Sequence, residues 1–156
     1  METKRKNIAI LGSTGSIGTQ ALDIIRDYPD KFSAEVLVAN NNSQLLIAQA
    51  REFEPNFVVI ANKDKFAEVR DALADLPIKV YAGSESILDV VAMDCVDMVL
   101  AAMVGFAGLL PTIKAIEAGK VVALANKETL VVGGKIICDK LKESATSCIL
   151  PVDSEH

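Results

Sequence analysis

Three glycines follow the first apolar run of the sequence at a spacing that suits a bound phosphate. Gly12, Gly15 and Gly18 form the pattern G-x-x-G-x-x-G directly after residues 7–11, and a helical pattern follows them. In such a loop the backbone turns sharply and approaches a pyrophosphate, and the last glycine lets helix and strand pack closely. The N–H groups at the start of the helix then face the phosphates. The loop therefore predicts a dinucleotide site, although a plain strand-to-helix turn would use similar residues.

Side chains in this loop, and at the end of the second apolar run, suit a phosphorylated dinucleotide. Ser13, Thr14 and Ser16 add hydroxyl donors to the loop, and residues 40–43 read Asn-Asn-Asn-Ser without an acidic side chain. An Asp or Glu at this second place would bind the 2′-hydroxyl of NAD and repel the 2′-phosphate of NADP. Neutral amides can hold a phosphate, so NADPH is the predicted cofactor. An asparagine run is also a good turn, however, and no arginine stands here.

Two carboxylates near the end of the sequence have a spacing that suits a divalent metal ion. Asp153 and Glu155 are two residues apart, so in an extended segment both side chains point to one side. Hard carboxylate oxygens suit Mg²⁺ or Mn²⁺ rather than zinc. Taken alone, these acids fit a solvated chain end better than a metal site, and their place after a predicted strand is one of the observations that favour a site.

A lysine stands between a predicted strand and a predicted helix, where ligands gather in open α/β sheets. Lys127 follows residues 121–125 and precedes residues 128–144. Its amine can stabilise a developing oxyanion or bind a phosphate there. Its neighbours Asn126 and Glu128 also fit structural roles, as a helix cap and a first-turn acid.

The elements that must position these residues alternate along the chain. Apolar runs predict strands at residues 7–11, 34–39, 57–61, 78–81, 98–102, 121–125 and 147–150. Helical spacing predicts helices over residues 17–28, 43–53, 63–74, 84–92, 108–118 and 128–144, with Ser43 and Ser84 as N-caps. Short connections and right-handed crossovers predict a Rossmann-like α/β fold. We expect a doubly wound, mostly parallel sheet of about seven strands with helices on both faces.

Composition argues against several other classes of protein. The 156 residues carry 16 basic and 21 acidic side chains, and this net charge of −5 argues against nucleic acid binding. Cys95, Cys138 and Cys148 form no C-x-x-C pair, and with one histidine they cannot make a standard structural zinc site. We expect such scattered cysteines to be buried thiols in a reducing compartment, and together with the absence of a signal-peptide pattern they predict a cytoplasmic protein. The longest uncharged stretch, residues 98–113, has 16 residues and is too short to span a membrane.

Four stretches together resemble one enzyme family. They are LGSTGSIG at residues 11–18, AAMVGFAGLLPTIKAIEAGK at 101–120, ALANKETLV at 123–131 and LPVDSEH at 150–156. The whole chain resembles the N-terminal part of the 1-deoxy-D-xylulose 5-phosphate reductoisomerase family, whose members use NADPH and a divalent metal in non-mevalonate isoprenoid biosynthesis. The resemblance implies an NADPH-binding domain over residues 1–150 and the start of a metal-binding catalytic domain at residues 151–156. It also implies a homodimeric parent enzyme, of which this fragment alone is inactive because the third metal ligand is missing.

The resemblance further implies roles for single residues. At the cofactor these are Thr14, Gly15, Ser16 and Ile17 in the phosphate loop, Asn42 near the 2′-phosphate, and Asn126 and Glu128 beside the nicotinamide. Gly12 and Asn40 join them as parts of the same two loops. Lys127 and Ser154 match substrate contacts, Asp153 and Glu155 match metal ligands, and Lys127, Ser154 and Glu155 are the candidate catalytic residues. One departure is Asn41, where many relatives carry a basic residue.

The implied reaction converts a phosphorylated sugar, 1-deoxy-D-xylulose 5-phosphate, to 2-C-methyl-D-erythritol 4-phosphate. In it the metal ion acts as a Lewis acid on the ketone and the neighbouring hydroxyl while the carbon skeleton rearranges, and NADPH reduces the resulting aldehyde. Two other functions remain open on the sequence. One is a different NADP-dependent dehydrogenase, and the other is a non-catalytic nucleotide-sensing module that is complete as it stands.

Overall fold

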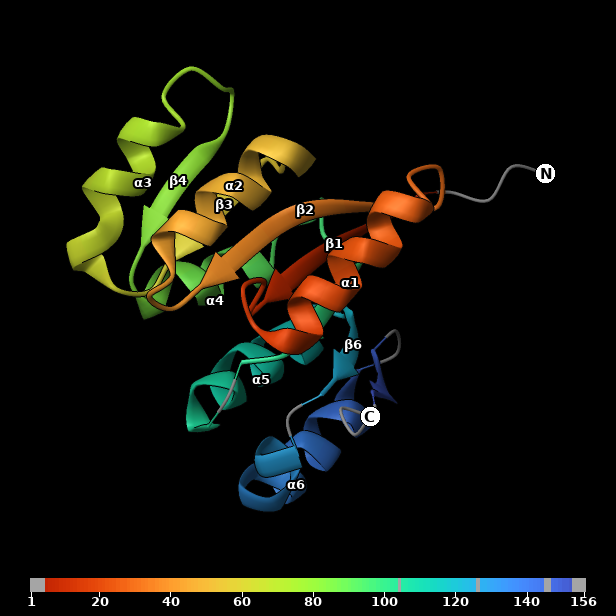
Figure 1. Ribbon diagram of the computed structural model, residues 1–156. Coiled ribbons are helices and arrows are strands. Elements are labelled where there is room, and N and C mark those ends of the chain that lie inside the picture. The colour runs from red at the N-terminus through yellow and green to blue at the C-terminus, as the bar shows by residue number, and fades with distance from the viewer. Residues whose placement is uncertain (1–4, 104, 126, 145–146, 153–156) are drawn as a thin grey trace.

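The strands form one parallel sheet (Figure 1). The computed structural model describes residues 5–103, 105–125, 127–144 and 147–152, with side chains except at 105–106 and 127–132. In these residues the sheet has seven strands in the order β4-β3-β2-β1-β5-β6-β7, and each neighbouring pair is parallel. The strands are β1 (Lys6–Leu11), β2 (Phe32–Ala39), β3 (Phe57–Ile60), β4 (Lys79–Ala82), β5 (Met98–Ala101), β6 (Val121–Leu124) and β7 (Cys148–Pro151).

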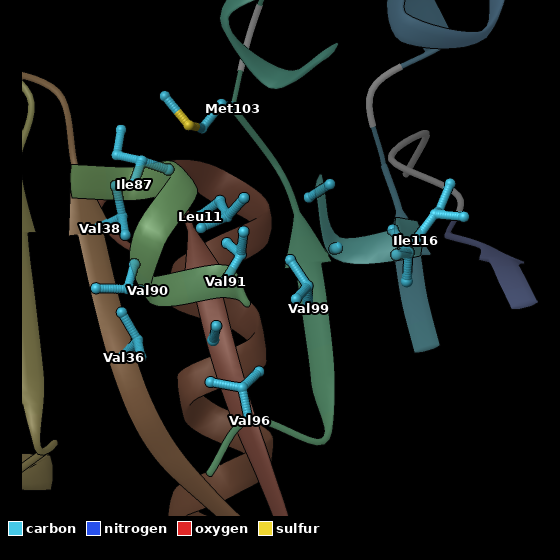
Figure 2. Close-up of a cluster of buried hydrophobic side chains, with 14 of the residues drawn as sticks. Leu11, Val36, Val38, Ile87, Val90, Val91, Val96, Val99, Met103 and Ile116 are labelled. Atoms are coloured by element: carbon cyan, nitrogen blue, oxygen red, sulfur yellow. The ribbon is translucent and has the colours of Figure 1, made fainter. Parts of the chain in front are cut away.

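Helices pack on both faces of this sheet, as the fold prediction requires. They are α1 (Ser16–Asp27), α2 (Ser43–Phe53), α3 (Phe66–Ala72), α4 (Ser84–Val91), α5 (Leu109–Glu117) and α6 (Lys127–Glu143), with short 3₁₀ helices η1 (Lys63–Lys65) and η2 (Gly105–Gly108). One buried cluster joins α1, α2 and α3 to one face through residues such as Leu22 and Leu46. A second cluster joins α4, α5 and α6 to the other face through residues such as Ile87 and Ile116 (Figure 2). The predicted doubly wound, Rossmann-like sheet is therefore confirmed.

The central strands are apolar along their whole length because both of their faces are covered. In β1, Ile10 belongs to the cluster under α1 while the next residue, Leu11, belongs to the cluster under α4. Leu37 and Val38 of β2 divide in the same way, and all four side chains are fully buried. Strands buried on both faces read as continuous Val, Ile and Leu runs. This arrangement explains the high apolar content of the chain. None of the described helices is both long and apolar enough to cross a membrane.

The structure corrects the expected starts of two helices. Asn42, rather than Ser43, is the N-cap of α2, since its side chain accepts a hydrogen bond from the Leu45 N–H at 3.2 Å. The Ser43 hydroxyl is already used, because it donates to the Glu68 carboxylate on α3. Gly83, rather than Ser84, is the N-cap of α4, and its φ of 93° supplies a turn that a side chain would strain.

The helix expected over residues 63–74 is divided into two shorter helices. Asn62 precedes η1, and its side-chain oxygen accepts a hydrogen bond from the Asp64 N–H at 3.0 Å. The chain then changes to α-helical geometry at Phe66. An asparagine at such a place competes with the regular helical hydrogen bonds, which is why the pattern of apolar residues did not predict the break.

Candidate functional site

The glycine loop lies at the carboxyl end of β1, in the middle of the sheet. Backbone N–H groups of Gly12 and Ser13 both donate to the carbonyl oxygen of Val38 on β2, at 2.8 and 2.9 Å. Gly12 has a φ of 94°, and a Cβ atom there would lie 2.8 Å from the carbonyl oxygen of Ala102. Only glycine fits this turn, because both its backbone conformation and its close approach to the chain after β5 exclude a side chain.

The other two glycines of the pattern serve different purposes. A Cβ atom on Gly18 would collide with the carbonyl oxygen of Gly12 and would lie 2.7 Å from the Cα of Ser13. Gly18 therefore lets α1 pack directly on the loop. A Cβ atom on Gly15 would meet only the Gly12 carbonyl oxygen, at an ordinary 3.5 Å. The protein's own packing does not require glycine at position 15, so the space in front of this residue is open to a ligand.

The amino end of α1 has backbone donors and no side-chain cap. Its N-cap is Gly15, which has no side chain to accept a hydrogen bond. Nearby, the Thr19 hydroxyl donates to the Ser16 carbonyl oxygen at 2.9 Å, and Gln20 donates to the Ser16 hydroxyl at 3.3 Å. The first N–H groups of a helix need external partners and carry a partial positive charge. This end of α1 can therefore hold an anion such as a phosphate.

One predicted donor of the loop is not available to a ligand. Ser13 is fully buried and its hydroxyl has no partner among the described residues, so the expectation that it donates to a phosphate is wrong. The cause lies in the turn at Gly12, which directs residue 13 toward α2. There, Nε2 of the buried Gln49 donates to the Ser13 carbonyl oxygen at 2.8 Å. Thr14 and Ile17 are partly exposed, and Ser16 is exposed, so these positions remain at the surface of the loop.

The asparagine run follows β2 at the same edge of the sheet. Asn40, Asn41 and Asn42 are all exposed. Asn62, at the end of β3, donates from its side-chain nitrogen to the Asn41 side-chain oxygen at 3.0 Å. Its backbone N–H also donates to the Asn40 carbonyl oxygen at 2.9 Å. These hydrogen bonds connect the ends of β2 and β3. The asparagine run therefore lies beside the glycine loop, as the sequence predicts.

A hollow of about 170 Å³ opens next to Asn40. Its walls come from the ends of β2 and β3, from the segment after β5 and from α4 and α5, and include Ala61, Ile87, Met103 and Leu110. Figure 2 shows Ile87 on α4 and Met103 close to the carboxyl ends of β1 and β2. An apolar hollow beside a phosphate-binding loop suits a flat, mostly apolar group such as a nucleobase.

The remaining predicted residues lie at α6 and at the end of the sequence. Lys127 begins α6, with two residues between it and the end of β6 at Leu124, so its backbone lies where the sequence places it. The side chains of Lys127 and Glu128 are not among those described, and Asn126, Asp153, Ser154 and Glu155 lie outside the described residues. The expectations for these residues stay predictions. Among the described residues, no three His, Cys, Asp or Glu side chains gather as a metal site.

The expectation that the cysteines are buried in the core is wrong for two of them, because Cys138 and Cys148 are exposed and Cys95 is partly buried. All three are free. Burial raises the pKa of the Cys95 thiol, and the neighbouring Glu35 carboxylate raises it further. A raised pKa keeps the thiol protonated, so Cys95 is a poor nucleophile.

Sequence reasoning missed two polar residues that hold the site together. Gln49 is buried on α2 together with Leu46 and Ala50. A polar side chain on this apolar helix face was the feature of the sequence that could have indicated a buried hydrogen bond. Asn62 gave no comparable signal, because its contacts with Asn40 and Asn41 come from the neighbouring strand end.

The sequence matches the family described as 1-deoxy-D-xylulose 5-phosphate reductoisomerase over residues 8–134. A relative of that name from Bacteroides thetaiotaomicron is 60% identical over 155 residues, covering 99% of this chain and 40% of the relative. The structure of the enzyme of that name from Zymomonas mobilis in complex with NADPH superposes with a TM-score of 0.91. It is 38% identical and covers 98% of this chain and 40% of that one.

A further structure, of DOX-P reductoisomerase in complex with NADPH, fosmidomycin and magnesium, also gives a TM-score of 0.91. It is 37% identical and covers 96% of this chain and 36% of that one. This chain therefore spans about 40% of the length of the relatives it matches. The family match covers most of the sequence and the fold agrees with it. The chain belongs to the 1-deoxy-D-xylulose 5-phosphate reductoisomerase family.

Proposed function

We propose that this chain is the NADPH-binding part of an enzyme that converts 1-deoxy-D-xylulose 5-phosphate to 2-C-methyl-D-erythritol 4-phosphate. The observation that carries the proposal is the amino end of α1, where Gly15 leaves backbone donors uncapped and open space in front of them. A pyrophosphate fits this place because it needs close backbone approach and several N–H donors. Solved relatives of this family hold NADPH.

The positions of the other parts of the cofactor follow from the order of the strands along this edge of the sheet. With the pyrophosphate at the glycine loop, the adenine occupies the hollow next to Asn40, and the ribose with its 2′-phosphate lies over Asn40, Asn41 and Asn42. The nicotinamide then points the other way along the edge, toward the ends of β5 and β6. Asn126 and Glu128 follow β6 in the sequence, and they are our candidates for its neighbours. When bound, the cofactor supplies a hydride.

We further propose that Asp153 and Glu155 bind a divalent ion, Mg²⁺ or Mn²⁺. Two carboxylates that alternate with Ser154 follow β7 in the sequence, after Val152, and such side chains supply hard oxygens. Strand β7 is parallel to the rest of the sheet and ends at the same edge as the glycine loop. A bound ion would polarise the oxygens of the substrate. Lys127 would place a cation beside the developing negative charge, and the Ser154 hydroxyl would hold the substrate by a hydrogen bond. The solved structure of one relative, DOX-P reductoisomerase, is a complex with magnesium.

The setting of the whole enzyme is also part of the proposal. We expect a homodimer in the cytoplasm that takes a phosphorylated sugar and no nucleic acid. Three free cysteines agree with a reducing compartment, and a net charge of −5 disfavours nucleic acid.

The test has one measurement for the cofactor and one for the reaction. Titration of this chain with NADPH, followed by nicotinamide fluorescence, is expected to show saturable binding, and no binding at millimolar cofactor would contradict the proposal. In a protein of the relatives' full length that contains this sequence, NADPH oxidation should require both the sugar phosphate and Mg²⁺ or Mn²⁺. Asp153→Asn should abolish that turnover and leave NADPH binding intact. Unchanged turnover in this variant would refute the metal assignment.

A further inference from the structure

The loop after β2 presents two amide side chains whose oxygen atoms are already in use. Asn41 Oδ1 accepts from the Asn62 side chain at 3.0 Å, and Asn42 Oδ1 accepts from the Leu45 N–H at 3.2 Å. In the part of the chain that the structure describes, neither Asn41 Nδ2 nor Asn42 Nδ2 has a partner, and both residues are exposed. The amide groups of Asn41 and Asn42 that have no partner are therefore their two NH₂ groups, which are donors only.

A pair of donors distinguishes the two dinucleotides chemically. A phosphate has only acceptor oxygens at neutral pH, so each NH₂ group can bind it. The 2′-hydroxyl of NADH needs an acceptor for its own proton, and the usual acceptor in such sites is an acidic side chain. Here the side-chain oxygens of Asn41 and Asn42 already accept one hydrogen bond each from the protein itself. The loop thus favours the 2′-phosphate without a basic side chain at position 41.

Asn62 determines which way the Asn41 amide faces. The Asn62 Oδ1 accepts from the Asp64 N–H at 3.0 Å, which directs its Nδ2 to Asn41. A reversed Asn62 amide would set two donors against each other at Asp64. The backbone of η1 therefore fixes Asn62, and Asn62 fixes the donor face of Asn41 outward.

Two charged groups near this loop, Lys63 and Glu68, contact other groups of the protein. Lys63 lies 4.0 Å from Glu85 on α4, and its side chain passes over Gly83. Glu68 accepts from the Ser43 hydroxyl. The neutral amides are thus the groups of this loop that are oriented to meet an anion.

We propose that Asn62 is a positioning residue for cofactor choice: it orients Asn41 so that Asn41 and Asn42 together donate to the 2′-phosphate of NADPH. This inference rests on the proposed function, since it assumes that the dinucleotide lies across this edge of the sheet. It adds a residue outside the second-strand loop to the determinants of NADPH preference.

The test replaces Asn62 by serine and compares two cofactors. Asn62→Ser keeps an oxygen that can accept from the Asp64 N–H, because serine is a good cap, but its side chain is too short to reach Asn41. We expect NADPH to bind roughly 5- to 10-fold more weakly, as for the loss of one ordinary hydrogen bond, and the affinity for NADH to change less than twofold. The matched control is Asn56→Ser, because Asn56 donates to Glu35 at 2.5 Å from the opposite end of β3. This control should leave the ratio of the two affinities unchanged.

A double-variant cycle separates positioning from a general structural effect. Asn41→Ala should show the same selective loss of NADPH affinity, and adding Asn62→Ser to it should cause little further loss. Additive losses, equal losses for NADPH and NADH, or unchanged NADPH binding in Asn62→Ser would each overturn the inference while the proposed function stands. If Asn62→Ser does not fold, the selectivity of Asn41→Ala decides, and an unchanged ratio there overturns the inference. A native chain that binds no NADPH overturns both.

Discussion

Gln49 on α2 donates a hydrogen bond of 2.8 Å to the carbonyl oxygen of Ser13, in the middle of the glycine loop. Both residues are buried, and this is the direct side-chain link between α2 and the phosphate loop among the described residues. The helix that begins at the asparagine run therefore also supports the loop at the end of β1. The two halves of the proposed dinucleotide site are connected through the body of α2.

Replacing Gln49 by leucine should weaken both stability and cofactor binding. Leucine fits the apolar surroundings of α2 but leaves the buried Ser13 carbonyl oxygen without its donor. Such a loss costs about 1–3 kcal/mol, so the free energy of unfolding in urea should fall by about that amount. NADPH affinity should fall as well, because the loop loses a support. Gln44→Leu, on the exposed side of the same helix, is the control for stability and should change it by less than about 0.5 kcal/mol. Equal effects of the two substitutions would contradict this role of Gln49.

Alanine substitutions at two glycines of the loop should have opposite consequences. Gly15→Ala meets only ordinary contact at 3.5 Å, so its stability should change by about 1 kcal/mol or less, the usual range for an N-cap. Its NADPH affinity should fall at least about tenfold, because the new methyl group occupies the ligand's space. Gly18→Ala places a Cβ 2.7 Å from the Ser13 Cα and should destabilise the fold strongly. Thermal unfolding and NADPH titration measure both effects, and normal NADPH affinity in Gly15→Ala would place the pyrophosphate elsewhere.

Much of the fold follows from local patterns, because its strands are buried on both faces and its helices on one. A strand buried on both faces is a continuous apolar run in the sequence, as in β1 and β2. A helix buried on one face has apolar residues at helical spacing, as in α2. The glycine loop is equally readable, since positive φ at Gly12 and close packing at Gly18 both demand glycine.

The parts that were wrong or missed depend on contacts between distant residues. Ser43 is the first helical residue of α2 rather than its cap, and its hydroxyl donates to Glu68, which lies 25 residues further along the chain. Asn62 acts on Asn41 across 21 residues, and only the pairing of β2 with β3 brings them together. No local pattern encodes such contacts. The assignment of Asp153 and Glu155 as metal ligands stays a prediction, which rests on their spacing and on the family resemblance, because both residues lie outside the described part of the chain.

Asn42→Asp should shift cofactor preference from NADPH toward NADH. Aspartate caps a helix as well as asparagine and suits the positive end of α2, so stability should stay the same or rise slightly. Its carboxylate, however, removes the free NH₂ group and repels the 2′-phosphate. The ratio of NADPH to NADH affinity should fall at least about tenfold, by analogy with the acidic residue of NAD-binding sites. Fluorescence titration with both cofactors measures the ratio, and an unchanged ratio would mean that the ribose does not lie over this loop.

An ion pair between α1 and α2 should make stability depend on pH. Arg26 donates to both carboxylate oxygens of Glu52, at 2.5 and 3.0 Å, and these hydrogen bonds hold the pKa of Glu52 below its ordinary value. Because the folded-state pKa is the lower one, the stabilisation is present above the unfolded-state pKa and is lost as pH falls through the folded-state value. Glu52→Gln should therefore lower the Tm at neutral pH and have no effect once Glu52 is protonated. Both side chains are half exposed, so the Tm difference should be a few degrees at most and should shrink in high salt.

The matched variant for this pair is Glu54→Gln. Glu54 lies two residues further along, at the end of α2, and has no ion pair among the described residues. Removing its charge alters the net charge of the protein by the same amount but breaks no contact with Arg26. The Tm difference between Glu52→Gln and Glu54→Gln, followed from neutral to acid pH, isolates the ion pair. If the two variants track each other across the whole range, the contact between Arg26 and Glu52 contributes nothing and general charge effects explain the acid sensitivity of the fold.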